Sequence, residues 1–332
     1  MWPGERPASR ATFRAQRRSG MIAAMRKRWN WRHLLGVLLV LAALPPLLRN
    51  SEWRALDAAA RAAAPGAHVQ LGEGSVHYEL AGPADGPPVL LVHGFSVPSY
   101  IYDPTFAALA AAGHRVIRFD LYGRGASDRP RGAYGIARYT RQIDELLAAL
   151  GIEGPVDLVG LSMGGAITAA YAAEHPARVR RLVLIDPMAS ARDIGPLRWP
   201  LLGDYLFRVM VLPGMAAGQA GDFLHPERFP DWSQRYRPQM RYFGFGRAIL
   251  STLREVATRD PLPTYRAVGA QQRPVLLVWG EQDQTVPYAL SGAVRAALGA
   301  HRFLAVADAG HLPHLERPEV VEPVLLEFLR AP

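Results

Sequence analysis

The sequence predicts an α/β fold, in which helices cover both faces of a mostly parallel β-sheet. From His68 onward, short β-rich runs alternate with helical stretches, which is the pattern of an α/β sheet. Several runs are continuously apolar, as in 88–92 and 274–279, and such strands suit a parallel sheet that is buried on both faces. The chain has 332 residues and is 49% hydrophobic, which suffices for one large domain with an appendage.

Eight strands and at least four helices are expected in this body. We expect the strands near 68–71, 75–81, 88–93, 115–120, 156–161, 181–186, 274–279 and 301–306. We expect the helices near 104–112, 135–150, 164–174 and 318–330. The regular alternation fails between Pro187 and about Arg273, which predicts an insertion. The expected division is therefore a core of 68–187 and 271–332 that is interrupted by an insertion at 188–270.

The expected insertion is rich in aromatic residues. They are Trp199, Tyr205, Phe207, Phe223, Phe229, Trp232, Tyr236, Tyr242, Phe243 and Phe245. Such rings either line an apolar ligand cavity or pack into the insertion's own core, and the sequence leaves both readings open.

The positive charge of the chain is concentrated at its start. Residues 1–33 hold nine Arg or Lys residues and one acidic residue, so this segment carries eight of the nine net positive charges. The rest of the chain is nearly neutral. Because a nucleic-acid surface needs a basic footprint on the folded body, this distribution argues against a nucleic-acid partner.

An uncharged apolar run of fifteen residues, 34–48, follows the basic segment. Its length falls between the apolar region of a signal peptide and a membrane-spanning helix, so we expect a transmembrane anchor or a signal sequence, and a linker at 49–67. A buried N-terminal helix is the alternative. The nearest small-x-small tripeptides, 58–60 and 62–64, come late for a signal peptidase, which favours an uncleaved anchor. Met21 and Met25 precede the run and are alternative start residues.

The basic flank also predicts a location. By the positive-inside rule, it stays in the cytoplasm and sends the remainder to the outer side of the membrane. We therefore expect a membrane-anchored protein with a periplasmic or extracellular catalytic domain, or a protein that is secreted after signal cleavage. The chain has no cysteine, which excludes disulfides, thiolate catalysis and iron–sulfur centres.

A Gly-x-Ser-x-Gly pattern at 160–164 lies between a predicted strand and a predicted helix of small residues. Glycines in this context permit a sharp strand-to-helix turn that holds the serine at strained dihedral angles with its hydroxyl exposed. Ser162 is therefore the candidate nucleophile.

A serine hydroxyl needs a base, and the base needs a group that fixes its tautomer. Asp283 lies in the loop after the strand at 274–279 and is the candidate acid, with Glu281 and Asp186 as alternatives. His311 lies in the loop after the last strand and is the candidate base, with His314 as its competitor.

Two backbone N–H groups are candidate oxyanion donors. His93 ends the third predicted strand, and the turn that follows it can aim the N–H of Phe95 at a carbonyl oxygen under attack. The N–H of Met163, directly after the nucleophile, is the second donor. We expect His93 to order this loop and not to act as a base. The turn at 120–128 is expected to shape the mouth of the site without taking part in the chemistry.

Together these motifs resemble the α/β-hydrolase superfamily, with a match from about His68 to Arg330. The resemblance implies a triad of Ser162, Asp283 and His311, an oxyanion hole at Phe95 and Met163, an eight-stranded sheet, and a lid inserted after the sixth core strand. An N-terminal anchor followed by this core is similar to membrane-bound monoacylglycerol lipases and carboxylesterases. A serine at position 162 argues against the epoxide hydrolases and dehalogenases of this fold, which have an aspartate there.

We therefore predict a serine hydrolase that cleaves carboxylic esters, with an acyl-chain ester or a monoglyceride as substrate. The reaction needs neither a metal nor an organic cofactor. The alternatives are a C–C bond hydrolase of ring-cleavage products, a cofactor-free perhydrolase, and a ligand sensor built on a hydrolase core.

Overall fold

The computed structural model describes residues 31–330, which form two compact units that divide between Arg49 and Asn50. The first unit contains helix α2 (Trp31–Leu48), with two prolines inside its last turns. Within 31–330, no helix has both the length and the apolar character to cross a membrane. The predicted transmembrane anchor at 34–48 is therefore not supported.

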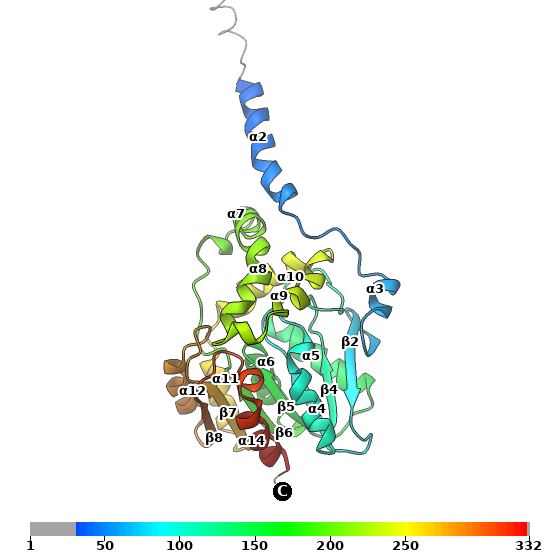
Figure 1. Ribbon diagram of the computed structural model, residues 1–332, viewed down its shortest axis with the longest axis vertical. Helices are drawn as coiled ribbons and strands as arrows, with labels where there is room; N and C mark the ends of the chain where they lie inside the picture. Colours follow the sequence, from blue (N-terminus) through cyan, green and yellow to red (C-terminus); the bar gives the residue numbers. More distant parts are fainter. Residues whose placement is uncertain (1–30, 331–332) are drawn as a thin grey trace, which may run out of the picture. The chain divides into compact units, whose positions relative to one another are not determined.

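An eight-stranded mixed sheet forms the centre of the second unit (Figure 1). Its strands are β1 (Ala67–Leu71), β2 (Gly74–Ala81), β3 (Pro88–Val92), β4 (Arg115–Phe119), β5 (Val156–Leu161), β6 (Val179–Ile185), β7 (Val275–Gly280) and β8 (Arg302–Val306). Their spatial order is β1-β2-β4-β3-β5-β6-β7-β8. The pairs β1–β2 and β2–β4 are antiparallel, and all other neighbours are parallel. The predicted fold class and its eight strands are confirmed.

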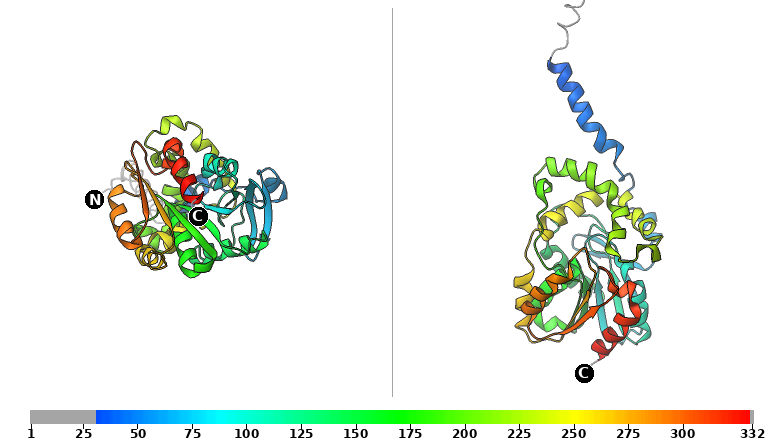
Figure 2. Two further views of the ribbon diagram at one scale, coloured as in Figure 1. Left: turned by 90° about the horizontal axis from the view of Figure 1, so that it is seen from below. Right: turned by 60° about the vertical axis from the view of Figure 1, so that its left-hand side comes forward.

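Helices cover both faces of this sheet (Figure 2). The α-helices of the second unit are α3 (Ala58–Ala62), α4 (Asp103–Ala111), α5 (Ile136–Ala149), α6 (Met163–Glu174), α7 (Leu202–Leu206), α8 (Met215–Gly218), α9 (Trp232–Tyr236), α10 (Phe245–Thr252), α11 (Leu262–Gly269), α12 (Ser291–Leu298), α13 (Pro313–Glu316) and α14 (Pro318–Arg330). Helices α4 and α14 pack on one face, and α5, α6, α11 and α12 form the other layer. The four helices predicted from periodicity correspond to α4, α5, α6 and α14.

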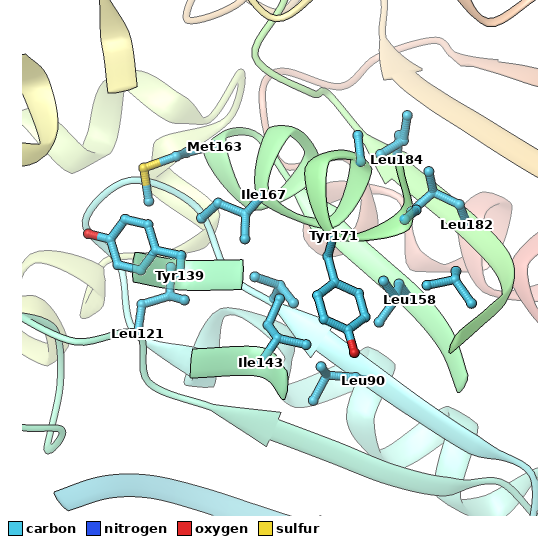
Figure 3. Close-up of a cluster of buried hydrophobic side chains, with 14 of the residues drawn as sticks. Leu90, Leu121, Tyr139, Ile143, Leu158, Met163, Ile167, Tyr171, Leu182 and Leu184 are labelled. Atoms are coloured by element: carbon cyan, nitrogen blue, oxygen red, sulfur yellow. The ribbon is translucent and has the colours of Figure 1, made fainter. Parts of the chain in front are cut away.

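The face under α5 and α6 is closely packed (Figure 3). Tyr139 and Ile143 lie one turn apart on α5 and are fully buried, because side chains four residues apart share one helix face. They pack beside Ile167 and Tyr171 of α6 and over Leu158 of β5. Burial of each such aliphatic side chain stabilises the fold by roughly 1.5–3 kcal/mol. This core fixes the position of α6, and with it the turn that carries Ser162.

The segment between β6 and α11, residues 187–261, is here called the cap segment. It contains the short helices α7 to α10, which lie together over one end of the sheet (Figure 1). Helix α11 falls inside the predicted insertion of 188–270, but it packs against α6 and α12 in the helix layer of the core. The observed cap is therefore shorter at its C-terminal end than the predicted range.

The aromatic residues of the cap segment mainly pack against one another. The rings of Phe223 and Phe229 stack with centroids 4.3 Å apart, and Trp232 meets Phe223 edge-on at 5.1 Å. Tyr236 packs edge-on against Phe245 at 6.2 Å. Offset and edge-on ring pairs of this kind stabilise a core beyond their area burial. These rings form the interior of the cap.

Residues 50–66, predicted as part of a linker, lie against the cap segment and are here called the strap. The Glu52 carboxylate accepts hydrogen bonds from the N–H groups of Gly244 and Gly246, at 2.7 and 2.6 Å. These groups lie at the start of α10, where a negative charge is favourable. The N–H of Arg54 donates to the carbonyl of Arg241 at 2.9 Å. The strap is thus hydrogen-bonded to the cap segment and is not a free tether.

Candidate active site

Ser162 occupies a strained turn between β5 and α6. Its backbone φ is 54° and ψ is −119°, a combination that residues with a side chain rarely adopt. The flanking glycines are required because neighbouring backbone atoms leave no room for a side chain at their positions. A Cβ on Gly164 would lie 2.1 Å from the carbonyl oxygen of Val92, and one on Gly160 would lie 2.5 Å from that of Gly164. The sequence therefore forms the turn because only glycine fits at both positions.

His311 and Asp283 are hydrogen-bonded to each other. The distance from His311 Nδ1 to Asp283 Oδ2 is 2.7 Å, and both side chains are buried. Asp283 Oδ1 accepts the N–H groups of Thr285 and Val286 at 2.7 and 2.8 Å. With Nδ1 donating to the carboxylate, the second ring nitrogen of His311 is the atom that can accept a proton.

The electrostatics of this pair favour a protonated imidazole. Burial works to lower the pKa of His311, but the hydrogen bond to Asp283 and its negative charge outweigh burial and raise the pKa above its ordinary value. The backbone of His311 is held as well, because its N–H donates to the carbonyl of Asp222 at 2.9 Å. The residue predicted as base is therefore fixed through both its side chain and its main chain.

The alternative acids take different positions. Glu281 is exposed, whereas Asp186 is fully buried beside Asp283. Burial, and then the nearby charge of Asp283, raise the pKa of Asp186 well above its ordinary value, so that this carboxyl is neutral. Its Oδ1 accepts the N–H of Gly280 at 2.9 Å. The structure therefore brings Asp283, and not Glu281 or Asp186, into hydrogen-bond contact with His311.

These side chains also have the spacing of a metal site. One ligand atom from each of Asp186, Asp283 and His311 lies within 4.8 Å of the others. The direct hydrogen bond between His311 and Asp283 uses two of these three ligands for one another. The donor set therefore fits a hydrogen-bonded pair of His311 and Asp283 better than a cation, since a metal would have to displace that bond.

His314, the competing histidine, is fully buried against the core. Its Nε2 lies 3.1 Å from the carbonyl oxygen of Ile101, and burial lowers its pKa to about 4. It does not line the pocket that contains Ser162. Its contacts support the loop after β8 and give it no access to a substrate.

The two predicted oxyanion donors lie on either side of Ser162. Met163 is the first residue of α6, where backbone N–H groups have no partner within the helix. His93 Nδ1 is 2.9 Å from the carbonyl oxygen of Gly94, and His93 Nε2 accepts the N–H of Leu121 at 3.0 Å. Because a trans peptide points its C=O and N–H in opposite directions, this contact turns the N–H of Phe95 away from His93.

His93 itself is neutral and acts within the loop. Burial lowers its pKa to about 4, and both ring nitrogens are used by backbone groups. Among residues 31–330, the N–H groups of Phe95 and Met163 have no hydrogen-bond partner. They are thus free to bind an anionic oxygen in the pocket.

Ser162 and His311 line one pocket of about 190 Å³. Phe95 lies in its wall beside them, and the cap segment contributes Met215 and Asp222. No aromatic residue among the described part of the cap lines this pocket, so the predicted aromatic ligand cavity is not observed there. A cavity of about 150 Å³ holds one benzene molecule, so this pocket suits a small group.

A second, larger cavity of about 350 Å³ lies beneath the strap. Its walls include Ala63 of the strap, His77 of β2, Tyr100, and Tyr242 of the cap segment. It contains no member of the predicted triad. The pocket around Ser162 is therefore the candidate active site.

Several residues that organise the site were missed by the sequence analysis. The buried carboxylate of Glu316 accepts the N–H groups of Leu224 and His225 in the cap segment, at 2.7 and 3.0 Å. It also accepts the N–H of Gly310, directly before His311, at 2.7 Å. The only available sequence signal was a glutamate five residues after the histidine, which by itself carries no mechanism.

The predicted turn at 120–128 is an organised cluster. Asp120 accepts hydrogen bonds from the N–H and hydroxyl of Ser99, from the N–H of Ala126 and from His77 Nδ1. Burial opposes the charge of Asp120, yet the hydrogen bond and charge of His77 hold its pKa below the ordinary value. The turn also contains Arg124, whose guanidinium reaches the oxyanion loop.

Known proteins resemble this chain in sequence and in fold. A family model described as the alpha/beta hydrolase fold matches residues 87–318. A Variovorax paradoxus protein, provisionally named as the carbamate hydrolase RutD, is 40% identical over 266 residues, which is 76% of this chain and 96% of that protein. A non-heme chloroperoxidase of Streptomyces lividans is 28% identical, over 77% of this chain and 96% of its own length. The solved structure of a thermophilic esterase from Thermogutta terrifontis superposes with a TM-score of 0.70 at 26% identity, covering 80% of this chain and 98% of the esterase.

Proposed function

The chain belongs to the alpha/beta hydrolase fold family, and on that premise we propose that it is a serine hydrolase that cleaves small carboxylic esters through an acyl-enzyme. The observation that carries the proposal is the 2.7 Å hydrogen bond between His311 and Asp283, in a pocket that His311 shares with Ser162. A serine at a strained turn, a histidine of fixed tautomer and two free N–H groups are the parts that acyl transfer requires.

The proposed reaction has two halves. His311 accepts the proton of the Ser162 hydroxyl while the Ser162 oxygen attacks the ester carbonyl, and the N–H groups of Phe95 and Met163 bind the oxyanion. Collapse of this intermediate expels the alkoxide, which takes the proton from His311 and leaves as the alcohol. Water then attacks the acyl-enzyme with the same assistance, releases the carboxylic acid and restores Ser162.

The size of the pocket argues for a short acyl group. A volume of about 190 Å³ is little more than the roughly 150 Å³ that encloses one benzene molecule. A long acyl chain, as in the predicted lipid ester or monoglyceride, exceeds this space. We therefore place the preferred substrates at the short end of the ester series.

Two relatives suggest other bonds for the same machinery. The protein named for carbamate hydrolysis is the more similar in sequence, and a carbamate also presents a carbonyl to an activated serine. The chloroperoxidase relative supports the cofactor-free perhydrolase reading. C–C bond hydrolysis and ligand sensing are the remaining alternatives.

The test is hydrolysis of p-nitrophenyl esters from acetate to laurate by the full chain in detergent, beside a model carbamate and a ring-cleavage product. We expect turnover that is highest for short acyl groups and is lost in Ser162→Ala. Faster turnover of the carbamate or the C–C substrate would transfer the assignment to that bond. Saturable binding without turnover of any substrate would favour a sensor.

We also propose that the N-terminal segment directs the body to the outer side of a membrane as a signal sequence. The proposal rests on the basic residues of 1–33 and the apolar run 34–48. Cell fractionation with N-terminal sequencing of the mature protein tests it. Recovery in the cytoplasm with an uncleaved N-terminus would contradict it.

A further inference from the structure

The loop that contains Phe95 is held by two side chains that do not line the pocket around Ser162. The carbonyl of Phe95 accepts a hydrogen bond from Arg124 Nε at 2.9 Å. The next carbonyl, that of Ser96, accepts one from Gln239 Nε2, also at 2.9 Å. The peptide before Phe95 is held by His93, so both peptide planes that flank Phe95 are fixed. The direction of its N–H follows from these contacts.

Arg124 is a fully buried cation with neutral partners. Its Nη1 donates to the hydroxyl of Tyr139 at 2.6 Å and to the carbonyl of Tyr122 at 3.2 Å. Its Nη2 donates to the hydroxyl of Thr252 at 2.9 Å. Within residues 31–330, no carboxylate forms an ion pair with it.

A buried charge without a counter-charge is costly in the resting protein. The cost is reduced here because dipolar oxygens surround the guanidinium. The Asp120 carboxylate lies in the same turn but is hydrogen-bonded to Ser99, Ala126 and His77. A substrate carbonyl that becomes an oxyanion at the N–H of Phe95 would add a further negative charge near Arg124. The positive charge of Arg124 is therefore better compensated in the transition state than in the free enzyme, which is the condition for a contribution to rate.

The cap segment supplies part of this arrangement. Thr252 ends α10, and its hydroxyl is 2.9 Å from that of Tyr139 as well as from Arg124. Gln239 also belongs to the cap, and its Oε1 accepts the N–H of Gly125 at 2.9 Å. Arg124 and Gln239 are the two side chains that bind the loop of Phe95. Arg124 is hydrogen-bonded to the cap through Thr252, and Gln239 is itself a cap residue, so the position of both depends on the position of the cap.

We propose that Arg124 is a positioning residue for the oxyanion hole, which fixes Phe95 against the cap segment and places a buried positive charge behind the developing oxyanion. This inference rests on the proposed acyl-transfer function and names a residue that the triad does not include. It predicts a loss of kcat with little change in KM, because the interaction strengthens in the transition state.

The test compares Arg124→Met and Arg124→Lys with Arg273→Met. Arg273 also donates to main-chain carbonyls, those of Val179 and Pro176, but it lies at the start of β7 and far from Phe95 in the sheet. Removing one oxyanion donor typically lowers kcat by about 10²–10³-fold, so misplacing one in Arg124→Met should lower it about 30-fold, with KM within about threefold. Arg124→Lys keeps the positive charge but lacks the branched guanidinium, so its kcat should lie between those of the wild type and Arg124→Met. Arg273→Met should keep kcat within about twofold.

A second readout does not depend on which bond the enzyme cleaves. The rate at which a fluorophosphonate labels Ser162 requires the same N–H donors, so it should fall in Arg124→Met by about the same factor as kcat. If Arg124→Met does not fold, Gln239→Leu provides the test, because it removes the contact to Ser96. It should also lower kcat with little change in KM, by a smaller factor than Arg124→Met.

The outcomes separate the two proposals. Ester turnover by the wild type with unchanged kcat and labelling in Arg124→Met would overturn this inference alone. Wild-type labelling without ester turnover would overturn the ester assignment and leave the labelling comparison to decide the role of Arg124. Wild-type protein that neither labels nor turns over esters would refute both.

Discussion

The carboxyl edge of the sheet and the cap segment contribute to the site in different ways. At the sheet edge, Ser162 directly follows β5, whereas Asp283 and His311 lie in the loops after β7 and β8, three and five residues beyond the ends of these strands. The cap segment is a series of short helices, and it supplies Met215 and Asp222 to the pocket wall. The predicted triad thus lies at the sheet edge, and the cap segment forms part of the pocket wall.

The two regions are nevertheless bound to each other at His311, the predicted base. Asp222 of the cap accepts the His311 N–H, and Glu316 of the core binds the cap at Leu224. Glu316 also holds Gly310, next to the histidine. The cap is therefore part of the support of the base and more than a cover. Substitutions in the two regions should separate these contributions.

The largest effect is expected at the sheet edge. Ser162→Ala removes the nucleophile and should lower kcat by about 10⁵-fold or more, since loss of a triad nucleophile costs about that much in serine proteases. Steady-state ester hydrolysis measures it. Ser233→Ala, in α9 of the cap and outside the pocket, is the matched control and should retain full activity. A Ser162→Ala protein with more than a hundredth of wild-type kcat would place the chemistry elsewhere.

Loss of the acid should lower kcat less than loss of the nucleophile. Asp283→Asn keeps the shape but loses the charge and the tautomer control, and about a 10⁴-fold loss of kcat is expected. Asp186→Asn is the control. The neutral Asp186 carboxyl resembles an amide in shape and in its hydrogen bond to Gly280. Asp186→Asn should therefore lower kcat by less than about tenfold. A reversed order of the two variants would assign the acid to Asp186.

The link between core and cap should show in stability as well as in rate. Glu316→Ala leaves one buried and two partly buried N–H groups without an acceptor, so we expect a loss of about 3 kcal/mol and about a tenfold lower kcat. Denaturant unfolding measures the first quantity. Glu319→Ala removes an exposed ion pair with Arg317, which solvent screens, and should leave the stability nearly unchanged. Equal losses in both variants would contradict the bridging role.

The pH profile tests the environment of the base. Because the pKa of His311 is raised above 6.5 and only the neutral imidazole accepts the serine proton, kcat/KM should fall as pH decreases through a value above 6.5. Below that value the loss approaches about tenfold per pH unit. Asp283→Asn removes the charge that raises this pKa and should move the acid limb to lower pH. A limb that does not move would show that another group titrates.

The smallest effect is expected in the cap. Met215→Ala enlarges the pocket and should shift the preference toward longer acyl groups by about five- to tenfold in the ratio of kcat/KM values, at the lower end of the effect of about 1–3 kcal/mol that one methylene has in an apolar pocket. Met210→Ala, exposed on the cap surface and outside the pocket, should leave the preference unchanged. An unaltered chain-length profile in Met215→Ala would remove the cap from substrate selection.

The same contrast explains how much the sequence could predict. The strands and the positions of Ser162, Asp283 and His311 could be predicted because apolar runs and turn glycines are local signals. The cap has no such period, so its aromatic residues could not be divided between core and ligand cavity. Arg124 was assigned to a turn without chemistry, because its partners Phe95 and Thr252 lie 29 and 128 residues away.

The N-terminal segment shows a different limit. Composition marks 34–48 as apolar, but no helix within 31–330 has both the length and the apolar character to cross a membrane. The strap is a related case. Its composition suggested a linker, whereas the hydrogen bonds of Glu52 to the start of α10 arise from tertiary contact between residues nearly 200 positions apart.

The central claim is that Ser162 forms an acyl-enzyme with the help of His311 and Asp283. Rapid quenching of the reaction with p-nitrophenyl acetate, followed by peptide mass analysis, measures it most directly. We predict a burst of p-nitrophenolate equal to the enzyme concentration and one acetyl group on Ser162. Steady turnover without an adduct on Ser162, or with the adduct on another residue, would contradict the account.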